Sequence, residues 1–135
     1  MDRAFALHVL GWWITSDGDS AISPTGGRHA NDEKHKDGWL EYYSTSLEAI
    51  APAIFETERF VSAKLQSRYF AQVKSRLVTI PNFSSGTSGL ILAGDLVQAE
   101  GVSFDTTASA ALCKAALMCK LDELEKAAAW EKRRL

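Results

Sequence analysis

The sequence predicts an α+β fold in which a small antiparallel sheet packs with helices, as a helix/sheet/helix sandwich. Apolar residues recur at helical spacing in the stretch before Leu77 and again after Asp105. Between these stretches, from Leu90 to Phe104, the apolar spacing alternates as in strands, and Ala93-Gly94-Asp95 is typical of a hairpin turn. A length of 135 residues suits a single domain, so residues 1–135 are expected to fold together.

The N-terminal part should form a short helix followed by a long loop. Asp2 can cap this helix and Gly11 can end it. Trp12-Trp13-Ile14 then predicts a short strand or an extended segment. Glycine, proline and polar residues dominate residues 15–38. Long loops of this kind are either disordered or functional, for example in gripping a ligand.

A second helix is expected to begin near Ser44, Thr45 or Ser46, any of which can cap it, with Glu48 close to the third helical position. Pro52 falls within its first two turns, where proline is tolerated best. The helix should run to about Arg76 or break near residues 66–69. Its predicted apolar face is made of Ile50, Ile54, Val61, Leu65, Val73 and Leu77. Lys64 and Arg68, four residues apart, would then lie on a charged, solvated face of the same helix.

The last helix should be capped by Asp105 or Thr106. Its predicted apolar stripe consists of Cys113, Leu117, Leu121, Leu124 and Ala128. Leu112 and Ala116 widen this face, which suggests packing against more than one neighbour. The second neighbour is either the second helix of the same chain or another copy, and we expect a homo-oligomer.

Composition excludes several classes of function. A net charge of −2 and a pI of about 5.9 argue against a protein that binds duplex nucleic acid. No segment approaches the length of a membrane span, and no signal peptide is visible. Cys113 and Cys119 are expected to be reduced thiols, because six residues along a helix hold them too far apart for a disulfide. These observations predict a cytoplasmic protein.

No catalytic, metal or cofactor site is predicted. His29 and His35 lie close to Asp32 and Glu33, but their spacing fits no zinc pattern. Cys113 falls on an apolar helix face, where a thiol is buried and inert. The chain is therefore not expected to be an enzyme.

Aromatic and basic residues near the long loop give the candidate ligand site. Flat aromatic side chains stack on nucleobases, and arginine binds phosphates. The alternative is that the tryptophans belong to the core and the loop charges are solvated. The predicted ligand-binding residues are Trp12, Trp13, Arg28, His29, Trp39, Tyr42 and Tyr43.

Three segments carry a resemblance to a known family. They are Met1-Asp2-Arg3-Ala4 with the following Gly11-Trp12-Trp13, the segment Tyr42 to Ile50, and the segment Asp105 to Leu117. Together they resemble small bacteriophage proteins that carry the phage ABA sandwich domain, although Ser46 stands where that family has aspartate. The resemblance implies a layer of sheet between helices, a phage protein in the cytoplasm of a bacterial host, and no established catalytic residues.

This setting predicts an anti-defence protein that binds and sequesters a small nucleotide immune signal, such as a cyclic oligonucleotide or an ADP-ribose derivative, without catalysis. The alternative is an interaction module that binds and inhibits a host defence protein. A nucleotide-degrading enzyme is the least favoured hypothesis, because nothing in the sequence brings its acid and base residues together.

Overall fold

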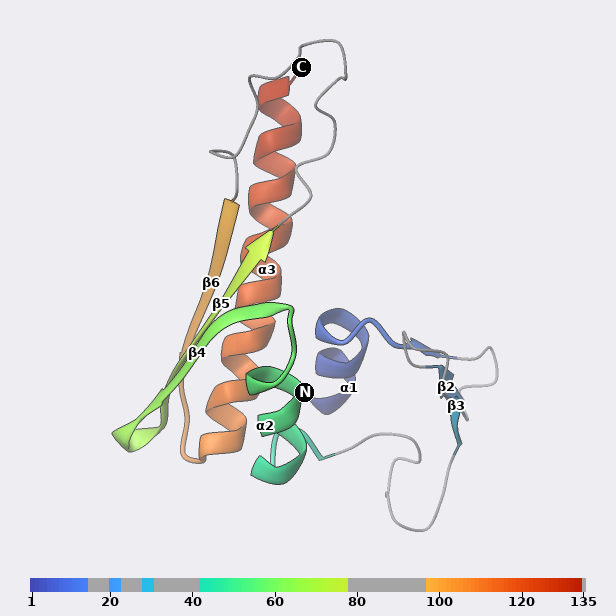
Figure 1. Ribbon diagram of the computed structural model, residues 1–135, viewed down its shortest axis with the longest axis vertical. Helices are drawn as coiled ribbons and strands as arrows, with labels where there is room; N and C mark the ends of the chain where they lie inside the picture. The colour runs from blue at the N-terminus through green and yellow to red at the C-terminus, as the bar shows by residue number, and fades with distance from the viewer. Residues whose placement is uncertain (15–19, 23–27, 31–41, 78–96, 135) are drawn as a thin grey trace.

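A three-stranded antiparallel sheet and a long C-terminal helix form the centre of the molecule. The computed structural model describes residues 1–14, 20–22, 28–30, 42–77 and 97–134 (Figure 1). The sheet has the order β4-β5-β6, with β4 at Phe60–Gln66, β5 at Phe70–Leu77 and β6 at Val97–Phe104. Helix α3, Ala108–Arg134, lies along one face of this sheet. The α+β class and the antiparallel sheet are thus confirmed.

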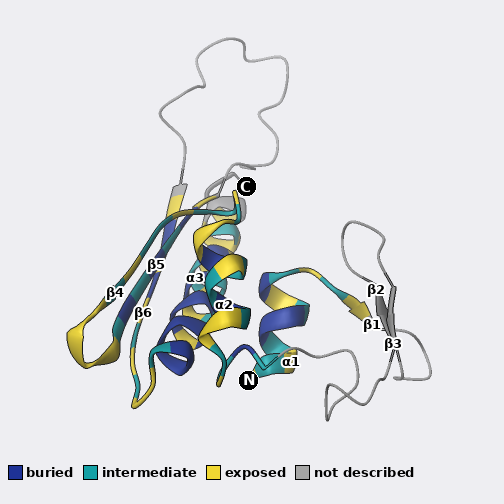
Figure 2. Ribbon diagram, turned by 60° about the horizontal axis from the view of Figure 1, so that its bottom comes forward, coloured by how far each residue is buried: buried dark blue, intermediate teal, exposed yellow. Residues whose placement is uncertain are grey.

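The remaining helices pack on α3. Helix α1, Asp2–Ala4, continues into a π-helical turn, η1, at Phe5–Val9, and α2 spans Leu47–Phe55. Both η1 and α2 contact α3 near its N-terminal half. The buried residues of these elements meet those of α3 and the sheet in one hydrophobic core (Figure 2).

The N-terminal helix ends as predicted but is held differently. Gly11 has a φ of 75°, the left-handed conformation that glycine adopts most readily at a helix end. Asp2 is the first helical residue rather than the cap. Its Oδ1 instead accepts a hydrogen bond of 2.6 Å from the backbone N–H of Ser44, which joins the chain start to the segment before α2.

The segment after Gly11 forms a second small sheet. The short strand predicted at Trp12-Trp13-Ile14 is β1, Trp13–Ile14. Two further strands, β2 at Ser20–Ile22 and β3 at Arg28–Ala30, extend it in the antiparallel order β1-β2-β3. The loop predicted over residues 15–38 therefore contains two strands.

The long second helix was a wrong prediction. Helix α2 ends at Phe55, where the Thr57 hydroxyl donates to the carbonyl of Ala53 at 2.6 Å. Residues 60–77 form the hairpin β4–β5. Its turn, η2 at Ser67–Tyr69, lies at residues 66–69, where the sequence predicted a possible break in the second helix. The pattern misled because the apolar positions fit helical spacing, whereas the aromatic and β-branched residues there favour strands.

Helix α3 begins later than predicted. The backbone N–H of Ala110, in the first turn of the helix, donates to the Thr107 hydroxyl at 3.2 Å. The capping side chain is therefore that of Thr107, and neither Asp105 nor Thr106 caps the helix. Asp105 instead forms an ion pair with Lys114 and accepts from the N–H of Thr106 at 2.6 Å. The hydrogen bond from Lys114, followed by that from Thr106, lowers the pKa of this carboxyl.

The apolar stripe of α3 was predicted correctly at Cys113, which is fully buried, and at Leu117, which packs against the core, but wrongly beyond them. Leu121 and Leu124 are each 54% exposed, and Ala128 is exposed as well. The buried residues of α3 that face the sheet and the core include Leu112, Cys113, Ala115, Ala116, Cys119 and Glu123. The reason is the closeness of β6, which at Gly101 approaches the backbone of α3 so tightly that small residues are required there.

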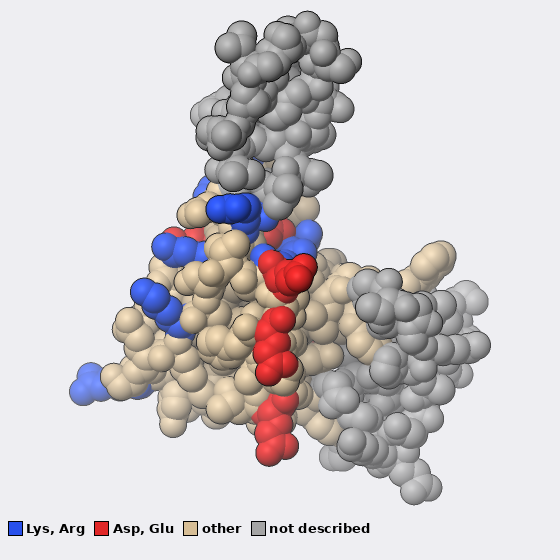
Figure 3. All heavy atoms as spheres, in the orientation of Figure 1, with Lys and Arg blue, Asp and Glu red and all other residues tan. Residues whose placement is uncertain are grey.

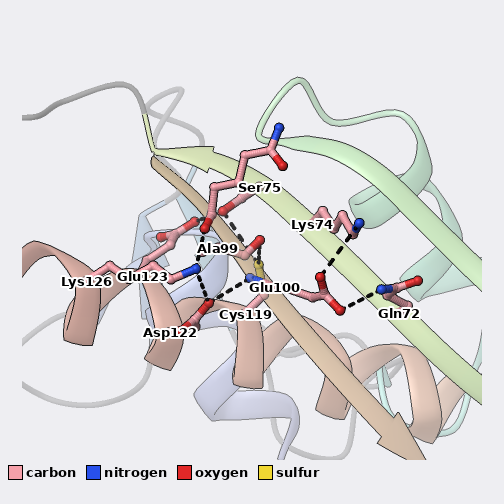
Figure 4. Close-up of polar contacts among 10 residues, drawn as sticks. Gln72, Lys74, Ser75, Ala99, Glu100, Cys119, Asp122, Glu123 and Lys126 are labelled. Atoms are coloured by element: carbon pink, nitrogen blue, oxygen red, sulfur yellow. Dashed lines mark hydrogen bonds and ion pairs between the residues drawn. The ribbon is translucent and has the colours of Figure 1, made fainter. Parts of the chain in front are cut away.

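Side chains of α3 also protect the free edge of the sheet. Asp122 accepts a hydrogen bond of 2.9 Å from the backbone N–H of Glu100, and Lys126 donates to the carbonyl of Gln98 (Figure 4). Because β6 is an edge strand, these contacts satisfy backbone groups that would otherwise be open to another strand. No helix in the described part of the chain is long and apolar enough to cross a membrane.

Candidate functional site

The structure separates the residues of the predicted ligand site. Trp13 is 73% exposed on β1, whereas Trp12 is half-buried and packs against the core. Tyr43 is buried with its ring 4.8 Å from that of Phe5, so it belongs to the core, and Tyr42 beside it is half-buried. Arg28 and His29 lie on β3, but their side chains, like the whole of Trp39, lie outside the described residues.

A more coherent surface is the side of the β4-β5-β6 sheet that faces away from α3, here called the open face. Ala71, Val73 and Ser75 of β5 are buried toward the helix, and their neighbours in sequence point the other way. No described helix lies over these outward residues (Figure 2). The open face consists of Lys64, Gln66, Phe70, Gln72, Lys74, Arg76, Gln98, Glu100, Val102 and Phe104.

Aromatic residues gather at one end of the open face. Phe70 pairs with Phe104 across the β5–β6 ladder, and their ring centroids are 4.9 Å apart at 56°. Phe104 nevertheless remains 70% exposed. Tyr69, in the adjoining turn, is 44% exposed. Large apolar rings held in water are costly, and such a cluster is typical of a binding surface.

The turn beside these rings has an unusual backbone. Arg68 and Tyr69 both have positive φ, 64° and 57°, although neither is glycine or asparagine. Each such residue costs roughly 1 kcal/mol or more relative to ordinary conformations. The twist of a hairpin favours positive φ at its turn, but asparagine and glycine would supply it more cheaply. The arrangement carries a cation and an aromatic ring to the tip of the hairpin.

The centre of the open face is basic. Arg68, Lys64, Lys74 and Arg76 lie on or beside it, and Glu100 is the acidic residue among them. In Figure 3, Lys and Arg atoms lie along the side of the molecule where the strands are and at the upper centre, where acidic atoms lie among them, and further Asp and Glu atoms form a line down the centre. A basic surface on a chain with a net charge of −2 favours an anionic partner.

Glu100 is held in place at this centre. It accepts a hydrogen bond of 2.6 Å from Gln72 and lies 3.6 Å from the ammonium of Lys74 (Figure 4). A carboxylate and two donors in a fixed row can pair with the amino and carbonyl groups of a planar base. The open face thus offers rings for stacking, cations for phosphate and a polar row for base edges.

The open face was not predicted, because helical spacing placed Lys64 and Arg68 on a helix. The pattern that indicates a strand here is the alternation of polar and apolar residues along β4. Lys64 and Gln66 point outward, and Ala63 and Leu65 point inward. The pairing of Phe70 with Phe104 joins residues far apart in the chain. Only the register of the sheet brings these two rings together.

The described cysteines do not form a reactive centre. Cys113 and Cys119 are unpaired and fully buried. Burial, aided by the negative charge of Asp2, raises the pKa of Cys113 to about 12, and burial also raises that of Cys119. Among the residues that the structure describes, no group of histidine, cysteine and carboxylate side chains could hold a metal ion.

We expect the buried thiol of Cys113 to make the fold weaker in alkali. Its pKa rises from 9.0 to about 12 on folding, so the stability it contributes is complete below pH 9.0 and is lost as pH climbs toward 12. Urea unfolding at a series of alkaline pH values measures this decline. The same series on Cys113→Ala should show a shallower decline, and equal slopes would contradict the assignment.

Fold and surface together define a small α+β protein that presents an open, aromatic and basic sheet face. No protein family, curated protein or solved structure matches the chain.

Proposed function

We propose that this protein binds a small nucleotide on its open face and sequesters it without chemical change. The observation that carries the proposal is the exposed Phe104, packed against the half-buried Phe70, beside the cations Arg68 and Lys64. Aromatic rings stack on any nucleobase, and arginine and lysine bind the phosphates attached to it. One compact face supplies both kinds of contact.

The resemblance to phage ABA sandwich proteins supplies the setting for this proposal. It supports a phage protein that acts in the bacterial host cytoplasm against a nucleotide-signalled defence. A cyclic oligonucleotide or an ADP-ribose derivative combines the planar base and the phosphates that the open face suits. Sequestration needs only affinity and slow release, and the rings and cations provide the contacts for both.

Phe104→Ala is expected to weaken nucleotide binding strongly. Stacking on one aromatic side chain contributes about 1–3 kcal/mol per base, which corresponds to a loss in affinity of roughly five- to 150-fold. The measurement is calorimetry with a cyclic dinucleotide, a cyclic trinucleotide and a cyclic ADP-ribose as probes. Because Phe104 is 70% exposed, its removal should leave the thermal unfolding midpoint almost unchanged.

Trp13→Ala is the matched control, because Trp13 is an exposed ring on the other sheet. Loss of binding in Trp13→Ala but not in Phe104→Ala would move the site to the predicted N-terminal aromatic residues. Heating the protein after incubation and filtration tests sequestration. Intact nucleotide in the heated supernatant supports it, degradation products would indicate an enzyme, and no retained probe would reject these ligands.

A second candidate function is inhibition of a host defence protein through the same end of the sheet. Tyr69, in the turn of the β4–β5 hairpin, is exposed, as are Val102 and Phe104 on β6, which pair with Gln72 and Phe70 at the start of β5. Aromatic residues beside arginine are typical of the residues that dominate protein interfaces. Recovery of a stoichiometric protein partner from infected cells would favour this function. The Phe104→Ala variant should lose that partner, and the protein should show no response to nucleotides.

A further inference from the structure

An apolar row that begins near the middle of α3 and runs into its C-terminal half is half-buried at Leu117 and largely in water beyond it. This row, here called the leucine seam, consists of Leu117, Leu121, Leu124 and Ala128. Leu121 and Leu124 are each 54% exposed, and Met118 beside them is 49% exposed. Figure 1 shows that α3 rises well beyond α1 and α2, which lie beside its N-terminal half. The part of the seam that follows Leu117 therefore lies where the described helices no longer reach.

The spacing of the seam is that of a helix pair. Its members follow each other at intervals of four, three and four residues, the alternation found at the a and d positions of a coiled coil. Cys119 lies on the opposite side of the helix and is fully buried. Helix α3 thus has two apolar sides, one that packs on its own sheet and one that the described residues cover only at Leu117.

We propose that the leucine seam pairs in parallel with the same seam of a second copy of this chain. Counting from Leu121 and Ala128 as a positions, Lys120 occupies a g position and Glu125 the next e position. In a parallel pair, a g residue faces the following e residue of the partner, so Lys120 of each copy meets Glu125 of the other. The seam is then flanked by two opposite-charge pairs.

An antiparallel pair would lack this complementarity. There e positions face e positions and g positions face g positions, which sets Glu125 against Met118 and Lys120 against Ala127. Glu125 is exposed and can reach a partner. The Lys120 side chain is 27% exposed and lies 3.5 Å from the buried Glu123 on the sheet side of its own helix, so its ammonium turns from Glu123 to Glu125 of the other copy when the pair forms. Charge therefore selects a second copy in parallel.

The seam spans only about 17 Å from Leu117 to Ala128, at 1.5 Å per residue. Such an interface lies at the small end of those that hold proteins together, so association should depend on concentration. Sedimentation of the full chain over a wide concentration series should show the mass rising from 14.8 kDa toward twice that value. A mass of one chain at every concentration overturns the proposal.

Two variants test the two parts of the interface. Leu121→Glu places a charge in the seam and should abolish the dimer with an unchanged far-ultraviolet circular dichroism spectrum, since Leu121 is largely exposed.

Glu125→Lys sets two positive charges against each other across the interface, because the new ammonium faces Lys120 of the other copy. This variant should weaken the dimer at least tenfold at low salt. Glu56→Lys is the control, because Glu56 is an exposed carboxylate at the end of α2. A dimer that survives Leu121→Glu, or that all charge changes weaken equally, refutes this interface.

Cross-linking tests the orientation. Ala128→Cys puts a thiol at an a position, which in a parallel pair faces the same thiol of the partner and can be oxidised to an intermolecular disulfide. The native cysteines are buried and do not compete. Addition of diamide should give a dimer on a non-reducing gel. In an antiparallel pair residue 128 would face Leu117, so failure to cross-link in a sample that sediments as a dimer would overturn the parallel arrangement.

Discussion

Replacing Gly101 by alanine is expected to destabilise the protein more than any other substitution of a single small residue in the described sheet. A Cβ at this position would lie 1.9 Å from the carbonyl oxygen of Ala115 and 2.3 Å from the backbone nitrogen of Cys119. Both obstacles are backbone atoms of α3, so no side chain can rotate out of the way. Either the helix moves off the sheet or the chain fails to fold.

The expected cost of Gly101→Ala is about 3 kcal/mol or more, the upper end of what overpacking causes in protein cores. For a domain of this size, that cost corresponds to a fall in the unfolding midpoint of about 10 °C or more. Thermal unfolding followed by circular dichroism measures the fall.

Two further variants make this result specific. Val102→Ala, at the next position of β6 but on the open face, should cost less than about 1 kcal/mol because Val102 is 39% exposed. Adding Ala115→Gly to Gly101→Ala should not restore stability, since the clash is with backbone rather than with the Ala115 methyl group. A wild-type midpoint in Gly101→Ala would show that α3 does not lie this close to β6.

Gly101 also explains why the inward side of α3 could not be predicted from hydrophobicity. Apolar periodicity favours the largest side chains, and it selected Leu121 and Leu124 as core residues. The close approach of β6 instead selects small residues such as Ala115 and Cys119, and it turns the leucines outward. The helix itself and its length were evident from the sequence, but its rotation depends on a contact between distant parts of the chain.

The same limit applies to the hairpin and to the candidate site. Ile54, Val61 and Leu65 fit a helical repeat, and the strand preference of the aromatic and β-branched residues around them is too weak to overrule it. The strand conformation of residues 60–77 is fixed by pairing with β6, which is a tertiary effect that overrides local pattern. Since the open face exists only when β4, β5 and β6 are in register, Phe104 could not be placed beside Phe70 from the sequence. Exposed Trp13 was predicted as a ligand residue, and that prediction stays open.

The second large effect is expected from the buried carboxylate of Glu123, which fastens the middle of α3 to the sheet. Glu123 is 5% exposed. It accepts a hydrogen bond from the Ser75 hydroxyl of β5 and another of 2.6 Å from the guanidinium of Arg59, just before β4. Lys120 lies 3.5 Å away on the same helix. One side chain thus joins α3 to β5 and to the residue that precedes β4.

Glu123→Ala should cost about 3 kcal/mol. Removing one partner of a buried ion pair costs about 3–5 kcal/mol because the other charge is left uncompensated. The lower end applies here, since the Arg59 side chain is 29% exposed and can recover some hydration. The Nε atom of Arg59 is already buried without a hydrogen-bond partner among the described residues, so loss of Glu123 leaves this guanidinium still poorer in contacts.

Urea unfolding of Glu123→Ala, Arg59→Ala and the double variant measures the coupling between the two residues. The double variant should be less destabilised than the sum of the single ones, because removing both charges leaves neither unpaired. Asp122→Ala is the neighbouring control. Its ion pair with Lys126 and its hydrogen bond from the Glu100 N–H are both open to water, so their loss should cost less than loss of the buried Glu123 contacts. If Glu123→Ala costs no more than Asp122→Ala, the buried carboxylate does not hold α3 to the sheet.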